Sequence, residues 1–344
     1  MKDILPDLIR WLEAGERIAL ATVVRSQGPS PRPVGSHLAV TASGKMAGSV
    51  SGGCVEGAVV REAEEVLQGA PPKRLRYGVV DEGGWEVGLA CGGTIEIYLE
   101  PLAPIHERLL EALQADETVA LVTRLDGGGH LLARPDGRTE GDPSLADELP
   151  TAFPGPLAQL RPHPEGDRFV QVFAPPPILT IVGAVHLAQP LVRLAQVMGF
   201  RVRVVDGRRF FATRERFPTA DELVVAWPQE AIRPEHLRPS DALVILTHDP
   251  KFDVPALEVA LRSRVGYIGL LGSKSTQERR RAALRERGFT DEDLARIHGP
   301  VGLDLGDAPE EIALGILAEI VAHRNRATRT PRPHPEPLSP PHAS

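Results

Sequence analysis

The first hundred residues alternate between helical and strand-like patterns of apolar positions. Apolar residues recur at helical spacing near the N-terminus and stop at Gly15, and short β-rich runs follow on either side of the Pro-rich loop 28–33. The predicted order is a helix over 2–15, strands over 18–24 and 37–41, a helix over 55–67 and a strand over 94–100. This order predicts an α+β domain. Residues 101–173 are less regular, with a helix and short strands such as 119–123 between Gly- and Pro-rich turns.

The second half of the chain has a different pattern, in which short, continuously apolar runs alternate with helical segments. Runs such as Ala-Leu-Val-Ile-Leu suit strands covered on both faces, and their alternation with helices predicts a doubly wound parallel sheet of the Rossmann type. The predicted strands are 178–182, 201–206, 223–225, 242–247 and 267–271, with helices ending at Met198 and Arg262 and two more over 277–287 and 309–322.

Three consecutive prolines, Pro175 to Pro177, lie between the two sequence patterns and predict an extended linker. We therefore expect an α/β protein with an N-terminal α+β domain over residues 1–174 and a Rossmann-like domain over 175–326. The Pro-rich segment 327–344 is expected to be disordered.

Composition narrows the class of protein. Hydrophobic residues make up 42% and charged residues 25% of the 344 residues, which is ordinary for folded domains. Lys and Arg number 39 against 46 Asp and Glu, a net charge of −7, so the chain lacks the positive field that nucleic-acid binding needs. No apolar segment is long enough to span a membrane. Because a chain of this size has only 2 cysteines, we expect a soluble cytoplasmic protein.

The first cysteine lies in a glycine-rich loop that runs into a predicted helix. Cys54 follows Gly52 and Gly53 and directly precedes the helix expected from Val55, whose N-terminal dipole favours a thiolate. The glycines let the backbone approach an anionic ligand closely, and their N–H groups suit a phosphate. We expect Cys54 to be the more reactive of the two thiols.

The second cysteine, Cys91, precedes Gly92 and Gly93 at the entry to a predicted strand. Neither cysteine has a Cys or His neighbour at the spacing of a zinc site. A role for both as small buried hydrophobes stays open beside a reactive one.

The turn after the first strand of the second domain matches part of a dinucleotide-binding fingerprint. Gly183 and Ala188 fill the first glycine and the final small position, but Val185 replaces the middle glycine, where the backbone must approach a pyrophosphate. Asp206 ends the second strand, where an acidic residue usually holds a ribose hydroxyl. The pattern supports the fold and argues against NAD(P) binding.

Other polar residues fall at the carboxyl ends of predicted parallel strands, the edge where such sheets bind ligands. His186 begins the first helix of the domain, and His248 and Asp249 follow a central strand. Gly272 and Ser273 end the next strand and precede a helix, which suits an anion and equally an ordinary capped helix start. We expect His186 and His248 to form a candidate cleft, and the turn at Gly272 and Ser273 is a candidate pocket for an anion.

Six longer motifs carry a resemblance to a known family. Two lie in the first domain, Gly48-Ser49-Val50-Ser51-Gly52-Gly53-Cys54-Val55-Glu56 and Gly88-Leu89-Ala90-Cys91-Gly92-Gly93. Four lie in the second, Leu246-Thr247-His248-Asp249-Pro250-Lys251, Tyr267-Ile268-Gly269-Leu270-Leu271-Gly272-Ser273, His298-Gly299-Pro300-Val301-Gly302-Leu303-Asp304 and Pro309-Glu310-Glu311-Ile312-Ala313. Together they resemble the XdhC/CoxI family of xanthine dehydrogenase accessory factors. The chain departs from the family at Val185, where the turn Gly-Ala-Gly-His reads Gly-Ala-Val-His.

The resemblance implies a molybdenum cofactor chaperone more than an enzyme with a substrate of its own. It implies that both glycine motifs, with Glu56, hold the pterin of the cofactor, and that Cys54 and Cys91 contact molybdenum or transfer sulfur. Soft thiolates suit that chemistry. It also implies cofactor sulfuration with a cysteine desulfurase and delivery to a xanthine dehydrogenase-type apoenzyme. A homodimer stays open.

Two other functions stay open beside this one. An NAD(P)-dependent oxidoreductase fits the topology of the second domain and Asp206, although Val185 and the lack of an evident acid–base set count against it. A protein-interaction scaffold, with both cysteines in the core, is the other. Metal analysis and pterin fluorescence of the purified protein distinguish the three.

Overall fold

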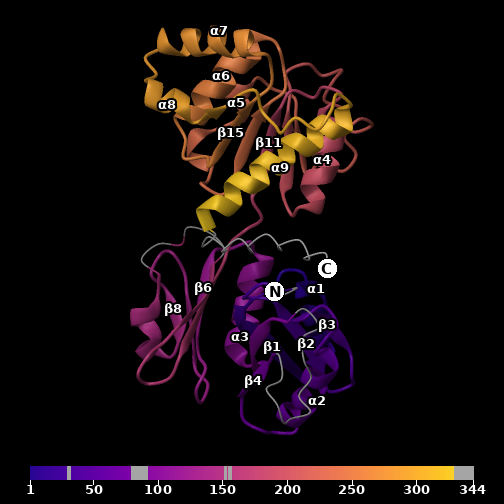
Figure 1. Cartoon of the computed structure of the whole chain (residues 1–344), viewed down its shortest axis with the longest axis vertical. Helices are drawn as coiled ribbons and strands as arrows, with labels where there is room; N and C mark the ends of the chain where they lie inside the picture. The colour runs from indigo at the N-terminus through magenta and orange to yellow at the C-terminus, as the bar shows by residue number, and fades with distance from the viewer. Residues whose placement is uncertain (29–31, 79–91, 151–152, 154–156, 329–344) are drawn as a thin grey trace, which may run out of the picture. The chain divides into compact units, whose positions relative to one another are not determined.

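The chain forms two compact units, Met1–Pro175 and a second that begins at Pro176. They are seen in a computed structural model that describes residues 1–28, 32–78, 92–150, 153 and 157–328 (Figure 1). The last helix continues to Thr328, and the rest of the predicted tail lies outside the described residues. Over the described ranges, every helix is too short or too polar to cross a membrane.

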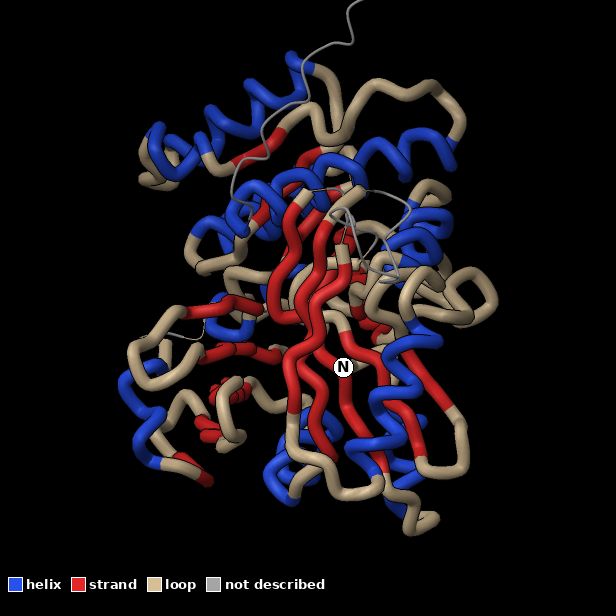
Figure 2. The backbone as a smooth tube through the Cα atoms, turned by 60° about the horizontal axis from the view of Figure 1, so that its bottom comes forward, coloured by secondary structure: helices blue, strands red, loops and turns tan. Residues whose placement is uncertain are grey.

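The first unit opens with a five-stranded antiparallel sheet in the order β3-β2-β1-β5-β4 (Figure 2, red strands). One face packs on α2, and the other packs on α1 and α3, so the central strand β1 is buried on both sides. The elements are α1 (Leu5–Glu13), β1 (Ile18–Gln27), β2 (His37–Thr41), β3 (Met46–Gly48), α2 (Glu56–Leu67), β4 (Lys73–Tyr77), β5 (Thr94–Pro101) and α3 (Pro104–Gln114).

A second five-stranded antiparallel sheet follows in the segment where the sequence pattern predicted only short strands. Its order, β8-β7-β6-β10-β9, is the order of the first sheet with each number raised by five. The elements are β6 (Val119–Arg124), β7 (His130–Ala133), β8 (Thr139–Gly141), the 3-10 helix η1 (Pro143–Glu148), β9 (Leu157–Arg161) and β10 (Arg168–Phe173). The first unit therefore contains the same topology twice.

The repeat extends to individual residues of one hairpin. Segments 37–48 and 130–141 align without a gap, each beginning His-Leu and carrying glycine at the eighth and twelfth positions. In both, the histidine pairs with a threonine of the preceding strand, Thr22 with His37 and Thr123 with His130. The equivalence follows from backbone pairing as well as from sequence.

The last glycine of each hairpin is required by close backbone contact. A Cβ atom on Gly48 would lie 2.3 Å from the carbonyl oxygen of His37, and one on Gly141 would lie 2.2 Å from that of His130. Both glycines also have positive φ, +85° and +110°. No other residue fits here without moving the strand.

The second unit is a six-stranded parallel sheet in the order β13-β12-β11-β14-β15-β16. Its strands are β11 (Ile178–Val182), β12 (Arg201–Val205), β13 (Glu222–Val224), β14 (Ala242–Ile245), β15 (Tyr267–Leu270) and β16 (Ile297–His298). Its helices are α4 (Ala188–Val197), α5 (Pro228–Ala231), η2 (Pro234–His236), α6 (Pro250–Leu261), α7 (Lys274–Arg285), α8 (Asp291–Ala295) and α9 (Pro309–Thr328).

Helices cover both faces of this sheet. One face packs on α4 and α9, and the other packs on α6, α7 and α8 (Figure 1). Counting strands from β11, the order is 3-2-1-4-5-6, which is that of dinucleotide-binding folds. The predicted Rossmann-like fold is confirmed. Several boundaries differ by a few residues, and at the candidate site α4 begins at Ala188 and not at His186.

We expect Gly48→Ala and Gly141→Ala each to lower the free energy of unfolding by at least about 2 kcal/mol more than Gly44→Ala and Gly137→Ala. All four glycines have positive φ, but a Cβ on Gly44 or Gly137 would meet nothing within 4 Å. The comparison isolates the clash from the backbone strain. Urea denaturation measures it, and equal losses in all four variants would contradict the proposed contact.

Candidate functional site

The sheet order brings the predicted site residues of the second unit to one edge. The strands β11, β12, β14 and β15 are parallel, so their carboxyl ends share an edge (Figure 1). The residues that follow these ends are Gly183, His186, Asp206, His248, Asp249, Gly272 and Ser273. The strand order reverses between β11 and β14, and open α/β sheets bind ligands at such a point. This edge is the candidate ligand site of the unit.

At the switch point, Gly183 is closely packed. A Cβ atom there would lie 2.5 Å from Cγ2 of Thr247, at the end of β14. Val185, two residues on, is half-buried and packs against the core. The turn is therefore shaped by contact with its own sheet, and the missing middle glycine is replaced by a side chain that takes part in that packing.

Asp206 is fully buried, and its carboxylate already has partners. It accepts hydrogen bonds from the Ala184 N–H at 2.8 Å and from the Arg208 N–H, Nε and Nη2 at 2.9, 2.9 and 2.8 Å. Burial alone would raise the pKa of Asp206, but these hydrogen bonds hold it below the ordinary value. A ribose hydroxyl would have to displace Arg208, whose guanidinium also lies 4.3 Å from the ring centroid of Phe211.

The end of β14 presents exposed groups over a buried ion pair. His248 is exposed, as is His186, and the Asp249 side chain caps α6 by accepting the Lys251 N–H at 3.0 Å. Beneath them, Asp253 is fully buried and is bound by Arg280 and by the hydroxyl of Thr247. Burial raises the pKa of Asp253, and its hydrogen bonds partly offset that effect.

Ser273 is the N-cap of α7, as the capped-helix interpretation expected. Its hydroxyl accepts the Thr276 N–H at 3.4 Å and lies 3.0 Å from the Ser275 hydroxyl and 3.1 Å from that of Thr276. Gly272 precedes it without a side chain to cover these groups. Three hydroxyls are thus gathered at the start of a helix.

In the first unit, the carboxylate of Glu56 occupies the place expected for a ligand. It accepts the backbone N–H groups of residues 50–53 at 2.8–3.1 Å. It also accepts the hydroxyls of Ser49, at 2.6 Å, and Ser51. Burial alone would raise the pKa of Glu56, but these donors lower it to about 2. The N–H groups of Gly52 and Gly53 therefore already have an internal anion.

Cys54 lies on the loop that Glu56 organises. Its side chain is exposed, and Val55 separates it from the first residue of α2. It is thus not a core residue. Cys91 lies outside the described residues, while Gly93 is buried with its Cα against Gly28.

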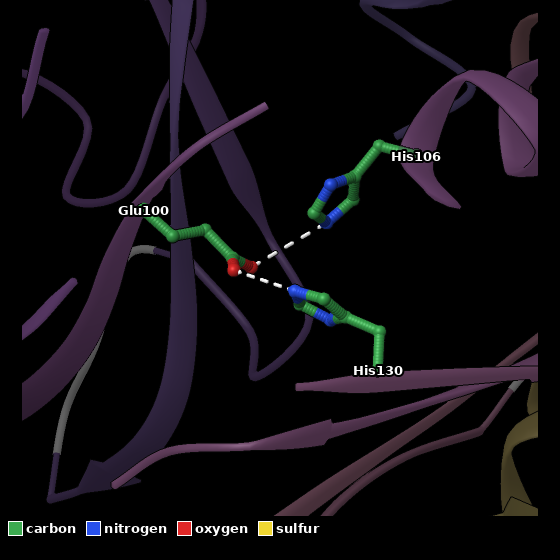
Figure 3. Close-up of side chains that lie close together, drawn as sticks. All are labelled: Glu100, His106 and His130. Carbon is green, nitrogen blue, oxygen red and sulfur yellow. Dashed lines mark ion pairs between the residues drawn. The ribbon is translucent and has the colours of Figure 1, made fainter. Parts of the chain in front are cut away.

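Sequence reasoning missed a buried polar cluster between the two sheets of the first unit. Glu100 at the end of β5, His106 in α3 and His130 in β7 point toward one another (Figure 3). His130 Nε2 lies 2.9 Å from one carboxylate oxygen, and His106 Nε2 lies 3.4 Å from the other. Burial alone would raise the pKa of Glu100, but the two imidazoles hold it below the ordinary value.

The hydrogen-bond partner of His106 shows what this cluster does. The Ala103 N–H donates to Nδ1 at 3.0 Å, so a neutral ring carries its proton on Nε2, facing Glu100. A metal would need the lone pair of that nitrogen. Although one Glu and two His are a familiar zinc set, we interpret the cluster as a buried carboxylate between two imidazoles, of which His130 lies at hydrogen-bond distance.

The repeat has a second version of this contact, with an amide in place of the carboxylate. His37 Nε2 lies 3.3 Å from the Gln171 side-chain oxygen, and Gln171 pairs with β6 as Glu100 pairs with β1. Burial holds the pKa of His37 well below its ordinary range. A cavity between these groups offers about 10 Å³ to the centre of a water molecule, enough for about one. The matching hairpins 37–48 and 130–141 were the signal that could have revealed both contacts.

We expect Glu56→Gln to lower the free energy of unfolding by about 3 kcal/mol at pH 7, because a neutral amide cannot accept from all these donors. The folded-state pKa, about 2, lies below the ordinary value of 4.5. The stabilisation is therefore present above pH 4.5 and is lost as the pH falls toward 2. Urea denaturation from pH 7 to 3 should show the two proteins converging. Glu64→Gln, an exposed position on the same helix, is the control, and a pH-independent difference would contradict this account.

We expect the dissociation constant for NAD(P) to exceed about 100 μM, because Val185 fills the turn and Arg208 binds the carboxylate of Asp206. Calorimetric titration with oxidised and reduced cofactor measures this. Low-micromolar binding would show that the turn has another way to admit a pyrophosphate.

Comparison with known proteins agrees with this arrangement. The family model of the XdhC Rossmann domain matches residues 179–320, and that of the XdhC and CoxI family matches residues 11–78. A Bacillus subtilis protein named as a probable xanthine dehydrogenase subunit is 29% identical, covering 92% of this chain and 96% of that one. The Escherichia coli molybdenum cofactor insertion chaperone PaoD is also 29% identical, covering 94% and 88%. A crystal structure from Bacillus halodurans, titled a xanthine dehydrogenase, superposes with a TM-score of 0.75 at 28% identity, covering 96% of this chain and 97% of that chain. The chain therefore belongs to the XdhC and CoxI family.

Proposed function

We propose that this protein binds the molybdenum cofactor and inserts it into a molybdenum hydroxylase of the xanthine dehydrogenase type. The observation that carries the proposal is the match along almost the full chain to a relative named a molybdenum cofactor insertion chaperone. The cofactor is cargo in this function, so the protein has to hold it and then release it to the apoenzyme.

The carboxyl edge of the parallel sheet supports this proposal in the second unit. It combines two exposed imidazoles, His186 and His248, with the hydroxyls that begin α7. Imidazole and hydroxyl groups can form hydrogen bonds with the polar edge of a pterin, and the N–H groups at the start of a helix can donate to its phosphate. Asp206 and Arg208 are tied to each other and shape the edge.

In the first unit, the exposed Cys54 supports a role in sulfuration. Sulfur transfer from a cysteine desulfurase would have the Cys54 thiolate attack the outer sulfur of the desulfurase persulfide and release that enzyme's cysteine thiolate. Glu56 supports this role indirectly because it fixes the loop on which Cys54 stands. Cys91 is proposed as the second sulfur or metal contact on sequence grounds.

Observations at the edge weaken the oxidoreductase alternative. The partners of Asp206 and the packing of Val185 both stand against a nucleotide. The exposure of Cys54 weakens the scaffold alternative, which needs both cysteines in the core.

We expect the combined variant His186→Ala/His248→Ala to bind the cofactor about tenfold more weakly. The full chain is mixed with cofactor released from a molybdoenzyme and passed through a desalting column, and bound molybdenum and pterin fluorescence are measured. His236→Ala is the matched control, because this exposed histidine precedes β14 and so belongs to the opposite edge of the sheet. A wild-type chain that retains neither metal nor pterin would overturn the proposed function.

A second measurement addresses sulfur. After incubation with a cysteine desulfurase and cysteine, mass spectrometry should find one added sulfur atom on the wild type and none on Cys54→Ser. Persulfide on Cys91 alone would contradict the role given to Cys54.

A further inference from the structure

The start of α7 differs in charge from the start of the neighbouring helix α6. The first turn of α7 has no acidic residue, whereas α6 is capped by Asp249 and has Asp253 in its first turn. The helix carries Lys274, Arg279, Arg280, Arg281 and Arg285 against Glu278. A helix of this length presents unpaired N–H groups and a partial positive charge at its N-terminus.

A buried guanidinium beneath this turn lacks a full set of partners. The Arg280 side chain is 4% exposed, and its Nε and Nη2 bind Asp253. Its remaining nitrogen, Nη1, is buried without a hydrogen-bond acceptor. Leaving a buried N–H group unpaired destabilises a protein, so the missing acceptor calls for an explanation.

The position of that nitrogen supplies the explanation. A Cβ atom on Gly272 would lie 3.6 Å from Arg280 Nη1 and 3.2 Å from Cγ2 of Thr276. The unpartnered nitrogen thus lies close to Gly272, where a side chain would crowd any approach to it. At the same turn, the hydroxyl of Ser273 lies 3.0 Å from that of Ser275 and 3.1 Å from that of Thr276.

We propose that the turn Gly272–Thr276 binds the phosphate of a phosphate monoester, with Arg280 beneath it and Lys274 beside it. Backbone N–H groups, hydroxyls and the Arg280 guanidinium lie at this turn, and Lys274 is the first residue of the helix. Such a set of donors suits a dianion with three terminal oxygens better than a carboxylate. One oxygen lies over the Cα of Gly272, where a side chain would exclude it, and accepts from Arg280 Nη1. The inference rests on the proposed function in one respect, since there the monoester is the phosphate of the cofactor.

Inorganic phosphate is the probe. The melting temperature of the full chain is measured in sodium phosphate and in sodium chloride of equal ionic strength. We expect phosphate to raise that of the wild type by about 2–4 °C more than that of Lys274→Gln or Arg280→Lys. Phosphate also stabilises proteins by exclusion from their surface, and this general effect cancels between variants. Arg280→Lys keeps a cation beside Asp253, and the exposed Lys274 can be changed without disturbing the core.

Lys251→Gln, in the first turn of α6, is the matched control and should keep the full phosphate effect. The same shift in the wild type and all three variants would overturn the site. Cofactor retention, measured in parallel, separates this result from the proposed function. If Arg280→Lys retains the cofactor as the wild type does, the phosphate site is wrong and the proposed function stands. If phosphate stabilises the wild type more than the site variants but the chain retains no cofactor, the function is wrong and the phosphate site stands.

Discussion

The pairing of β11 with β12 on one side and β14 on the other is the constraint on which the second unit depends. Because all three strands run in parallel, each connection must return across a face of the sheet, and helices therefore cover both faces. The same direction places every strand-to-helix turn at one edge. The collection of His186, His248 and Ser273 at that edge is thus a product of strand direction and not of local sequence.

The sequence predicted this unit well because its signals are local. Continuous apolar runs and intervening helices gave the strands within a few residues, and β11 has the predicted bounds 178–182. The second sheet of the first unit was not predicted because its strands are short and separated by glycine and proline turns. The contacts between distant side chains were not predicted for a different reason. Glu100, His106 and His130 are brought together by register and packing, which no periodicity reveals.

Two anion positions in this chain illustrate how a glycine-rich turn can be used. At residues 50–53 the backbone N–H groups donate to Glu56, a carboxylate of the same segment, and this contact fixes the loop. At the start of α7 the cap is a neutral hydroxyl, and a guanidinium nitrogen lacks an acceptor. Glycine content alone predicted a ligand at both turns. The two turns differ in that a carboxylate of the same segment, Glu56, accepts hydrogen bonds from the first.

The reciprocal contacts of the first unit, His37 with Gln171 and His130 with Glu100, are those of an isologous interface folded into one polypeptide. A true twofold dimer of one half would have to place the same residue at both positions. Carboxylates at both positions would double the free-energy cost of burying charge, and amides at both positions would leave neither histidine with a carboxylate partner. Fusion of the halves lifts that restriction. A carboxylate at Glu100 opposite an amide at Gln171 is an asymmetry that a dimer of identical halves cannot encode.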